Sequence, residues 1–450
     1  MSHPPRMARP RILQLALPTI AGNILFSTVT MIQTKFVGDL GAQAVAAVGV
    51  SQRVFFALQA ILTAIAVGTS ALVSRAWGAN DKDEAARVAM ASVIVAGGAS
   101  IVIMLIGTIG ATHIAGLFGL DAITTQLAAK NIFWLAIFIA GFAVDIILCG
   151  ALRATGNVWT PLAFVVAVNV INVPLLYTFI FGHFGAPAMG ASGAAFATGL
   201  SLTLSGAVLI GFWMKQKLTL KFFGELRSQA HRLRTLFRLS LPATLEQAVL
   251  QMGFFAFLML IGNFYGTEAF AAYNVGVNML NMGMVIGVGF SIAGSTLVGQ
   301  SLGAGDIDGA RRSGWRACAL AMTSMAALGA IVSYFAPELA HFFLGDEKLT
   351  VHYTTQLTYI LAAMLPLLGV DFAIGGSLRG AGDTRFPLFS TFSGLIAMRC
   401  GLSAIFVLAG LPVVWVYASM IGDYILKASL LIWRFHSGRW VHAMDRRGTR

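Results

Sequence analysis

The sequence predicts an all-α protein that crosses a membrane with twelve helices, arranged as two six-helix lobes. Of its 450 residues, 57% are hydrophobic and only 11% are charged, and the mean hydropathy is +0.80. A soluble protein carries about twice this charged fraction, and chains longer than roughly 250–300 residues split into domains rather than build one larger core. The composition therefore excludes a soluble enzyme, a secreted domain and a disordered chain.

Twelve apolar runs are long enough to span a bilayer, which takes about 20 apolar residues. The first run is too long for the core of a signal peptide and has no small-residue cleavage site, so we expect it to be retained. In chain order, the approximate spans are 12–37, 45–74, 88–115, 124–152, 161–182, 190–213, 236–262, 268–298, 314–343, 351–378, 387–409 and 412–433. The longest of these helices should tilt or extend beyond the membrane.

Lys and Arg residues gather in the N-terminal tail, in every second connection and in the C-terminal tail. Basic residues favour the cytoplasmic side of a membrane, so we expect a multi-pass protein of the cell inner membrane with both termini in the cytoplasm. The same asymmetry explains the net charge of +12, and we expect no nucleic-acid partner.

The cysteines Cys149, Cys318 and Cys400 show no paired spacing, which indicates neither disulfides nor a metal site.

The longest predicted connection divides the chain into two halves of six spans. Residues 1–214 form the predicted N-terminal lobe, and residues 215–238 form a cytoplasmic linker that holds seven basic residues. Residues 239–433 form the predicted C-terminal lobe, and residues 434–450 form a basic cytoplasmic tail.

The two halves contain an internal repeat. Residues 144–157 match residues 370–383 at an offset of 226, and residues 73–83 match residues 298–308 at an offset of 225. Six spans in each half give both halves the same orientation, so the repeat is parallel, with its axis along the membrane normal. Parallel repeats of this kind place a cleft between two lobes that rock to expose it to either side. The repeat therefore predicts a transporter.

Several motifs resemble those of the multidrug and toxic compound extrusion (MATE) family. They are Leu17-Pro18, the turn at 37–47, the Leu-Arg-x-x-Gly-[Asn/Asp] signature present in both halves, and the Gly-x-x-Gly-Ala-Ala-x-Ala-Thr run at 190–198. The resemblance covers essentially the whole chain. It implies a V-shaped antiporter with a central cleft, which exports small cationic or amphipathic drugs in exchange for H⁺ or Na⁺. It also implies a monomer among membrane lipids, with no cofactor and no enzymatic activity.

This sequence departs from the family pattern at three acidic positions. The Asp that members usually carry in the first span is Gln33 here. One branch keeps an Asp in the fifth span, four residues after an Asn; Asn172 fits the Asn, but Leu176 stands at the Asp. Another branch places a Glu in the seventh span where this chain has Leu250. The usual cation site of the N-terminal lobe is therefore expected to be neutral.

Three acids inside the predicted spans are the candidate ion-coupling residues: Glu246, Asp371 and Asp145. Ionisable groups in a membrane are costly and are functional hypotheses by default. Asp145 and Asp371 are repeat mates, and their symmetry fits either a structural role or a pair of protonatable gates, with the structural or gating role favoured for Asp145. Glu246 has no acidic counterpart, because Gly22 stands at its position in the first half.

Polar residues at helical spacing predict the lining of the substrate cleft. The candidates are Asn23, Ser27, Thr30, Gln33, Asn172, Gln247, Gln251, Asn274, Asn278 and Asn281. Hydrogen bonding between helices, worth about 0.6 kcal/mol for each contact, is the alternative role for most of them.

Three further charged residues lie deep in the last two spans. A lone buried guanidinium is very costly, so Arg399 is expected to pair with Asp423 on the next helix or with a backbone carbonyl. Asp423 and Lys427 stand one helical turn apart and can pair locally.

Other classes of function fit the sequence less well. There is no phosphate-binding Gly-x-x-x-x-Gly-Lys-[Ser/Thr] loop for an ATP-driven pump. The Gly-x-Gly-Asp run at 380–383 lacks the second catalytic Asp that an intramembrane protease needs. A lipid-linked precursor flippase of the same superfamily remains the alternative to a drug antiporter.

Overall fold

The computed structural model describes residues 11–222, 230–344 and 348–444. All regular secondary structure in these ranges is helical, which confirms the predicted all-α class. In chain order the elements are α1 (Ile12–Gly38), α2 (Ala42–Gly78), α3 (Lys82–Ile109), α4 (Ala111–Gly116), α5 (Ala122–Ile137), α6 (Ile139–Ala154), α7 (Trp159–Phe181), α8 (Ala191–Met214), α9 (Ala230–Gly303), α10 (Ile307–Tyr334), α11 (Ala336–Leu344), α12 (Lys348–Gly380), α13 (Arg385–Ser393), the π-helix η1 (Gly394–Leu402), α14 (Ser403–Leu408) and α15 (Val413–His436).

Within these ranges, eleven helical segments are long and apolar enough to cross a membrane, and α5 with α6 makes a twelfth. The continuous helix α9 supplies two of the segments, His231–Gly266 and Glu268–Gly303. They meet at Gly266, whose φ of 82° is a left-handed conformation that glycine adopts without steric cost.

The predicted span 124–152 is bent by 50° between α5 and α6. Phe138 at this bend packs against Gly199, where a Cβ atom would collide with its ring.

The doubled signature of the sequence is a pair of equivalent helix ends. Gly156 after α6 and Gly382 after α12 have φ of 93° and 84°, so glycine is the residue best suited to both positions. The amides of Asn157 and Asp383 each donate to a carbonyl five residues earlier, at 3.2 and 2.9 Å. This is the Schellman arrangement that ends many helices, and it explains why the glycine recurs.

The chain folds into two compact units. One contains residues Ala21–Thr244, and the other contains Met1–Ile20 together with Leu245–Arg450. We call them the N-terminal and the C-terminal unit. The division lies just beyond the predicted linker, and the first turns of α1 group with the C-terminal unit.

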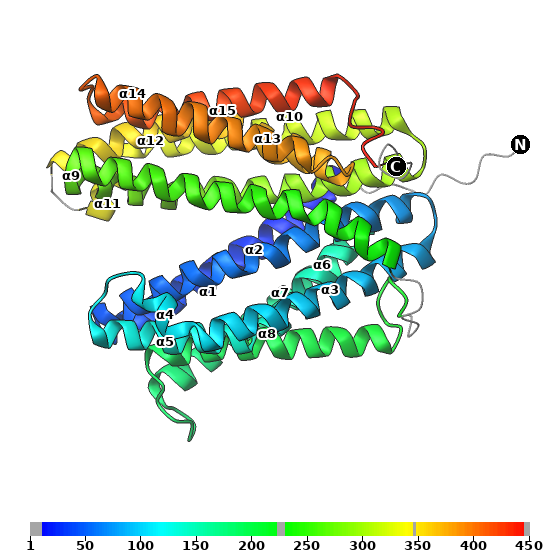
Figure 1. The fold of residues 1–450 in the computed structure, drawn as a ribbon, viewed down its shortest axis with the longest axis horizontal. Helices are drawn as coiled ribbons and strands as arrows, with labels where there is room; N and C mark the ends of the chain where they lie inside the picture. Colours follow the sequence, from blue (N-terminus) through cyan, green and yellow to red (C-terminus); the bar gives the residue numbers. More distant parts are fainter. Residues whose placement is uncertain (1–10, 223–229, 345–347, 445–450) are drawn as a thin grey trace, which may run out of the picture. The chain divides into compact units, whose positions relative to one another are not determined.

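In the N-terminal unit, α2 packs against α3, α5 and α6, while α8 packs against α5, α6 and α7 (Figure 1). Small residues and aliphatic side chains fill these contacts. One core cluster joins Leu62, Ile103 and Ile147, and another joins Val73, Leu152 and Trp213.

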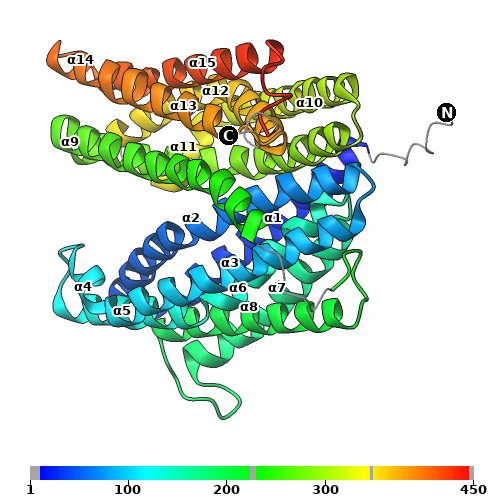
Figure 2. The same cartoon turned by 45° about the vertical axis from the view of Figure 1, so that its right-hand side comes forward.

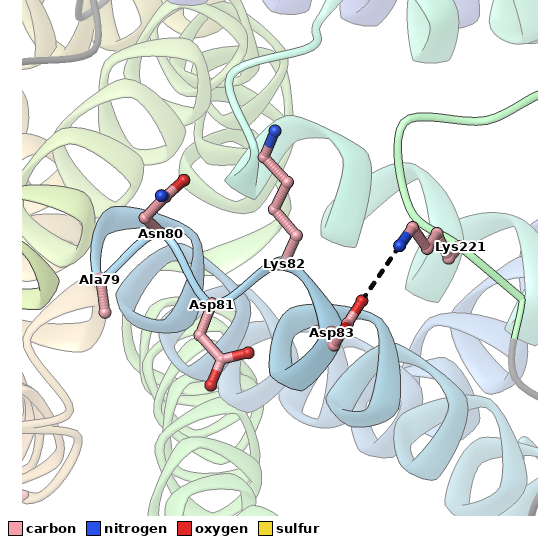
Figure 3. A pocket seen from close by; sticks show the side chains of 6 residues that line it. All are labelled: Ala79, Asn80, Asp81, Lys82, Asp83 and Lys221. Carbon is pink, nitrogen blue, oxygen red and sulfur yellow. Dashed lines mark hydrogen bonds and ion pairs between the residues drawn. The ribbon is translucent and has the colours of Figure 1, made fainter. Parts of the chain in front are cut away.

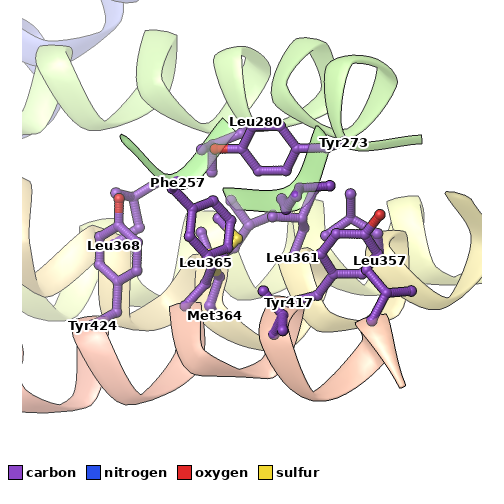
Figure 4. Packing of buried hydrophobic residues seen from close by; sticks show 14 of the residues in the cluster. Phe257, Tyr273, Leu280, Leu357, Leu361, Met364, Leu365, Leu368, Tyr417 and Tyr424 are labelled. Carbon is purple, nitrogen blue, oxygen red and sulfur yellow. The ribbon is translucent and has the colours of Figure 1, made fainter. Parts of the chain in front are cut away.

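In the C-terminal unit, α12 packs against α10, α11 and α15 (Figures 1 and 2). Its apolar core brings together Phe257 and Tyr273 of α9, Met364 of α12 and Tyr417 of α15 (Figure 4). Gly376 on α12 lies against the backbone of Ser291 on α9, where a Cβ atom would collide. Such small residues let membrane helices approach closely.

Candidate ion-coupling site

Glu246 on α9 is held by an ion pair in the C-terminal unit. It is 3% exposed, and its Oε1 lies 2.5 Å from Nη2 of Arg379 on α12. Arg379 Nε donates to Oε2 at 3.4 Å, and Thr391 Oγ1 donates to Oε1 at 3.4 Å. Two-pronged binding of a carboxylate by a guanidinium is a strong form of ion pair. Both oxygens of Glu246 are therefore engaged.

Asp423 on α15 lies between two cations. Its Oδ2 is 2.8 Å from Nη2 of Arg399 on η1, and its Oδ1 is 3.1 Å from Nζ of Lys427, one helical turn further along α15. These three side chains are at most 1% exposed. The predicted pairing of Arg399 with Asp423 and the local pairing of Asp423 with Lys427 are both confirmed.

Aromatic rings enclose the Arg399 guanidinium. Its central carbon lies 5.2 Å from the ring centroid of Phe254, 5.8 Å from that of Phe257 and 5.6 Å from that of Tyr424. Lys427 Nζ lies 4.8 Å from the same Tyr424 ring. The negative faces of aromatic rings attract cations, so the rings contribute to holding two positive charges around one carboxylate.

A π-helix positions this group of charges. Arg399 lies in η1, which interrupts the helical segment between α13 and α14. At the start of η1, Gly394 leaves no room for a Cβ atom, which would collide with Asp423 Oδ1 and Lys427 Cε. π-helical segments are rare and are frequent at functional sites.

Asp371 on α12 differs from Glu246 and Asp423 because it is partly exposed. Within the described residues its carboxylate makes no hydrogen bond and no ion pair closer than 4 Å. Lys427 is the charge that acts on it most strongly, followed by Arg379, and the carboxylates of Glu246 and Asp423 oppose these two cations.

The six charged side chains form what we call the ionic cluster. Its members are Glu246, Asp371 and Asp423 with Arg379, Arg399 and Lys427. The cluster is thus built from three acids and three bases, contributed by α9, α12, η1 and α15.

In the N-terminal unit, Asp145 on α6 has neutral partners. Ser205 Oγ on α8 donates to Asp145 Oδ1 at 3.0 Å, and the Cys149 thiol lies 3.9 Å from the same oxygen. Its hydrogen-bond partners are therefore a hydroxyl and a thiol, and the charge of Arg153 also acts on it. Two cations, Lys427 and Arg379, act on its repeat mate Asp371.

The family's usual cation position is neutral in this unit. Gln33 is 8% exposed, and its Oε1 accepts a hydrogen bond from Thr198 Oγ1 at 3.4 Å. Asn172 is 6% exposed, and its Oδ1 has no partner among the described residues. Leu176 is fully buried in an apolar cluster with Val37.

The remaining cleft candidates have varied surroundings. Asn23, Thr30, Gln247 and Asn274 are partly exposed, and Ser27, Gln251 and Asn281 are exposed. Thr30 Oγ1 and Asn274 Nδ2 donate to the carbonyls of Phe26 and Phe270, both at 3.0 Å, which satisfies these polar groups within their own helices. The side chain of Asn278 lies outside the described residues.

The sequence does not predict four of these partners: Arg379 and Thr391 beside Glu246, Ser205 beside Asp145 and Thr198 beside Gln33. Two of the four belong to motifs that the sequence shows. Arg379 is the basic residue of the doubled signature, and Thr198 closes the glycine-rich motif of α8.

An open pocket lies at the turn between α2 and α3 and near Lys221 (Figure 3). Asp81 is the N-cap of α3 and accepts from the Glu84 amide at 2.8 Å, while Lys221 Nζ lies 3.3 Å from Asp83 Oδ1. The two carboxylates that line this pocket thus cap the N-terminus of α3 and form a surface ion pair. In the part of the chain that the structure describes, no three His, Cys, Asp or Glu side chains form a potential metal site.

A helical membrane fold with an internal repeat and a buried ionic cluster defines a class of polytopic transport proteins. The chain belongs to the MATE family: the MatE family model matches residues 18–178 and 242–405. The two matches begin at Pro18 and Pro242, which open the first span of each half. The protein is therefore a membrane transporter, and it is not an enzyme.

Relatives and solved structures agree with this assignment. The chain is 28% identical over 440 residues to a probable multidrug resistance protein NorM of Thermotoga maritima, with 96% of this chain and 93% of the relative covered. A probable NorM of Rhodopseudomonas palustris is also 28% identical, with 94% and 90% covered. The fold matches that of a MOP superfamily transporter from Pyrococcus furiosus, described as having a binding pocket of reverse polarity, with a TM-score of 0.89, 22% identity and 96% of both chains covered.

Proposed function

We propose that this protein is a secondary active multidrug exporter, which expels small cationic or amphipathic drugs in exchange for H⁺ or Na⁺. Membership of the MATE family supports the transport class, and two similar relatives are named as probable multidrug resistance proteins. The distribution of basic residues supports an inner-membrane location with both termini in the cytoplasm.

The observation that carries the cation-exchange proposal is the ionic cluster. Moving even one charge from water into a protein interior costs several kcal/mol, and four members of the cluster are at most 3% exposed. Asp371 is the acid that is partly exposed and that no ion pair occupies. It is therefore the carboxylate best placed to receive a cation.

The same observation assigns different roles to the two units. Glu246 fixes Arg379 beside Asp371, so we propose that both acids take part in coupling. Asp145 is satisfied by Ser205 and serves as a gating or structural contact. The polar residues on α1, α7 and α9 are proposed to contact the drug, because exposed amides and hydroxyls can bind varied ligands.

Exchange follows from linkage between two ligands of one site. If a drug cation and a coupling ion bind the same negatively charged group, each must lower the affinity of the other by the same factor. Binding of the coupling ion on one side of the membrane then promotes release of the drug.

Everted membrane vesicles provide the test. Efflux of a fluorescent cationic dye would be driven separately by an imposed proton gradient and an imposed sodium gradient. We expect one gradient to drive transport. We expect Asp371→Asn to lower the rate more than roughly tenfold, since losing the charge that binds a cation costs about 2 kcal/mol or more. The matched control is Asp145→Asn. Dye movement that neither gradient drives would refute cation antiport.

A further inference from the structure

With its three acids and three bases in their ordinary charged forms, the ionic cluster has no net charge. Glu246 is bound by Arg379 at 2.5 Å, and Asp423 is bound by Arg399 at 2.8 Å. These two pairs leave Lys427 and Asp371 as the remaining charges of opposite sign. Lys427 also contacts Asp423 at 3.1 Å.

The internal repeat independently places Lys427 opposite Asp371. Helices α8 and α15 are equivalent at an offset of 222, which relates both their first and their last residues. Positions that are buried in both helices at this offset include Ala194 and Val416, Ala197 and Ser419, Ser201 and Asp423, Ser205 and Lys427, Leu209 and Leu431, and Trp213 and Phe435. The two helices therefore present the same faces to their units.

In this register Lys427 stands where Ser205 stands in the first half. Ser205 Oγ donates to Asp145 at 3.0 Å, and Asp145 is the repeat mate of Asp371. The equivalent positions in the C-terminal unit are those of Lys427 and Asp371, and Lys427 is the cation whose charge acts most strongly on this carboxyl group.

A cation that binds at Asp371 adds a positive charge to a neutral cluster in apolar surroundings. We propose that Lys427 gives up its proton in response, so that this lysine, rather than a carboxylate, carries the proton exchanged for the exported cation. The inference rests on the proposed function of cation export. It names the group within that site that carries the coupling ion, and it selects H⁺ as the ion.

The other members of the cluster are poor sources of this proton. An arginine side chain does not lose its proton in proteins, which excludes Arg379 and Arg399. The carboxylates of Glu246 and Asp423 are both engaged by cations. Asp371 is the acid at which the exported cation binds. Lys427 is the one base of the cluster that can lose its proton, and lysine changes its protonation readily when it is buried.

Two tyrosines of the same unit also carry dissociable protons. Tyr424 lies beside Lys427, and Tyr273 lies in the apolar core and interacts with Arg399 and Asp423. Ionising a buried phenol creates a new charge, whereas deprotonating a lysine removes one. Burial disfavours charged forms, so the proton leaves the lysine.

The proton step is simple to balance. One N–H bond of the Lys427 ammonium breaks, its electron pair stays on Nζ, and the proton passes to water. The neutral amine can still donate a hydrogen bond to Asp423, while the drug cation becomes the counter-ion of Asp371. Protonation of Nζ restores the original charge and expels the drug, as reciprocal linkage requires.

The test measures proton release when tetraphenylphosphonium binds to the purified full-length protein in weakly buffered solution with a pH dye. We expect the natural protein to release one proton for each bound cation, and its affinity to rise about tenfold per pH unit. Lys427→Arg keeps the positive charge but has no proton to give, so we expect weaker binding, no release and no dependence of affinity on pH. The matched control Lys221→Arg changes an exposed lysine and should behave like the natural protein.

A second variant covers the case in which the larger arginine side chain prevents folding. Lys427→Met is uncharged, like the deprotonated lysine, and leaves the Arg399–Asp423 pair intact. Its affinity for the cation should therefore be high and should not rise with pH. Proton release at the natural level in Lys427→Arg, or the natural pH dependence in Lys427→Met, would overturn the inference while leaving cation export standing. A natural protein that binds no cation would overturn both proposals.

Discussion

The two units share one helical plan but differ in the charges that they bury. At the positions equivalent to Glu246, Arg399, Asp423 and Lys427, the N-terminal unit has Gly22, Val173, Ser201 and Ser205. Of the six residues of the ionic cluster, Asp371 and Arg379 are the two with identical counterparts in the N-terminal unit, Asp145 and Arg153. The two units therefore share the helical scaffold, whereas the ionic cluster is present in the C-terminal unit.

This difference bears on the proposal that coupling takes place in the C-terminal unit. A buried charge needs partners. Each charged residue of the cluster that is present only in the C-terminal unit lies beside a residue of opposite charge. In the N-terminal unit a serine satisfies the remaining acid, and Leu176 extends the apolar core. These contacts support the proposal that the C-terminal unit carries the coupling site.

The largest expected effect comes from breaking the group around Asp423. Asp423→Ala leaves Arg399 and Lys427 buried without their carboxylate, and breaking a buried ion pair by removing one partner costs about 3–5 kcal/mol. The equivalent change in the other unit, Ser201→Ala, removes only a hydroxyl and should cost roughly 1 kcal/mol or less. Thermal unfolding of both variants in detergent measures the contrast.

A double-mutant cycle tests the pairing itself. Arg399→Ala, Asp423→Ala and the combined variant should show strongly non-additive losses, since residues in contact couple by about 0.5–3 kcal/mol. Additive losses would show that the two residues do not stabilise each other.

Glu246→Gln is expected to have the next largest effect. The amide cannot neutralise Arg379, so proton-driven drug efflux should fall more than roughly tenfold, with a loss of stability of about 2 kcal/mol or more. Adding Arg379→Gln removes the unpaired cation and should recover most of the stability but none of the transport. Efflux in vesicles and thermal unfolding separate the two effects, and efflux near the natural rate in Glu246→Gln would place coupling elsewhere.

The fold was largely predictable because its determinants are local and repeated. Runs of apolar residues set the spans, and the doubled glycine signature marked two equivalent helix ends. The Arg399–Asp423 pair was also predicted, since a buried guanidinium on one helix needs an acid on a neighbouring helix. These inferences needed only helix periodicity and the cost of burying charge.

The contacts of Glu246 and Asp371 were not predictable in the same way. Glu246 and Arg379 are 133 positions apart, and no local pattern links an acid on α9 to an arginine at the end of α12. The relation between Lys427 and Ser205 was hidden because the repeat offset changes from 226 at the signature to 222 in the last helix. Only the observed helix ends and buried positions set that register.

Where the repeat keeps the same residue, the two units should respond alike. Asp81 accepts from the Glu84 amide at 2.8 Å, and Asp306 accepts from the Gly309 amide at 2.7 Å, so each caps the N-terminus of a helix. Replacing either by Ala should cost about 1 kcal/mol, the usual value for a lost N-cap. Unfolding temperatures that fall by clearly different amounts would show that the two units are not equivalent even where the repeat is preserved.

The smallest effect is expected at Gln33, where the resemblance to the family implies an acid. Its one described hydrogen bond, from Thr198, is long at 3.4 Å, and an amide has no proton to exchange at neutral pH. Gln33→Ala should therefore leave proton-driven dye efflux within roughly twofold of the natural rate and cost about 1 kcal/mol of stability, the typical net value of one hydrogen bond. The control is Thr198→Val, which removes the donor of the same bond. A large loss of efflux in Gln33→Ala, with stability preserved, would show that the neutral unit takes part in coupling and would end the division of roles between the two units.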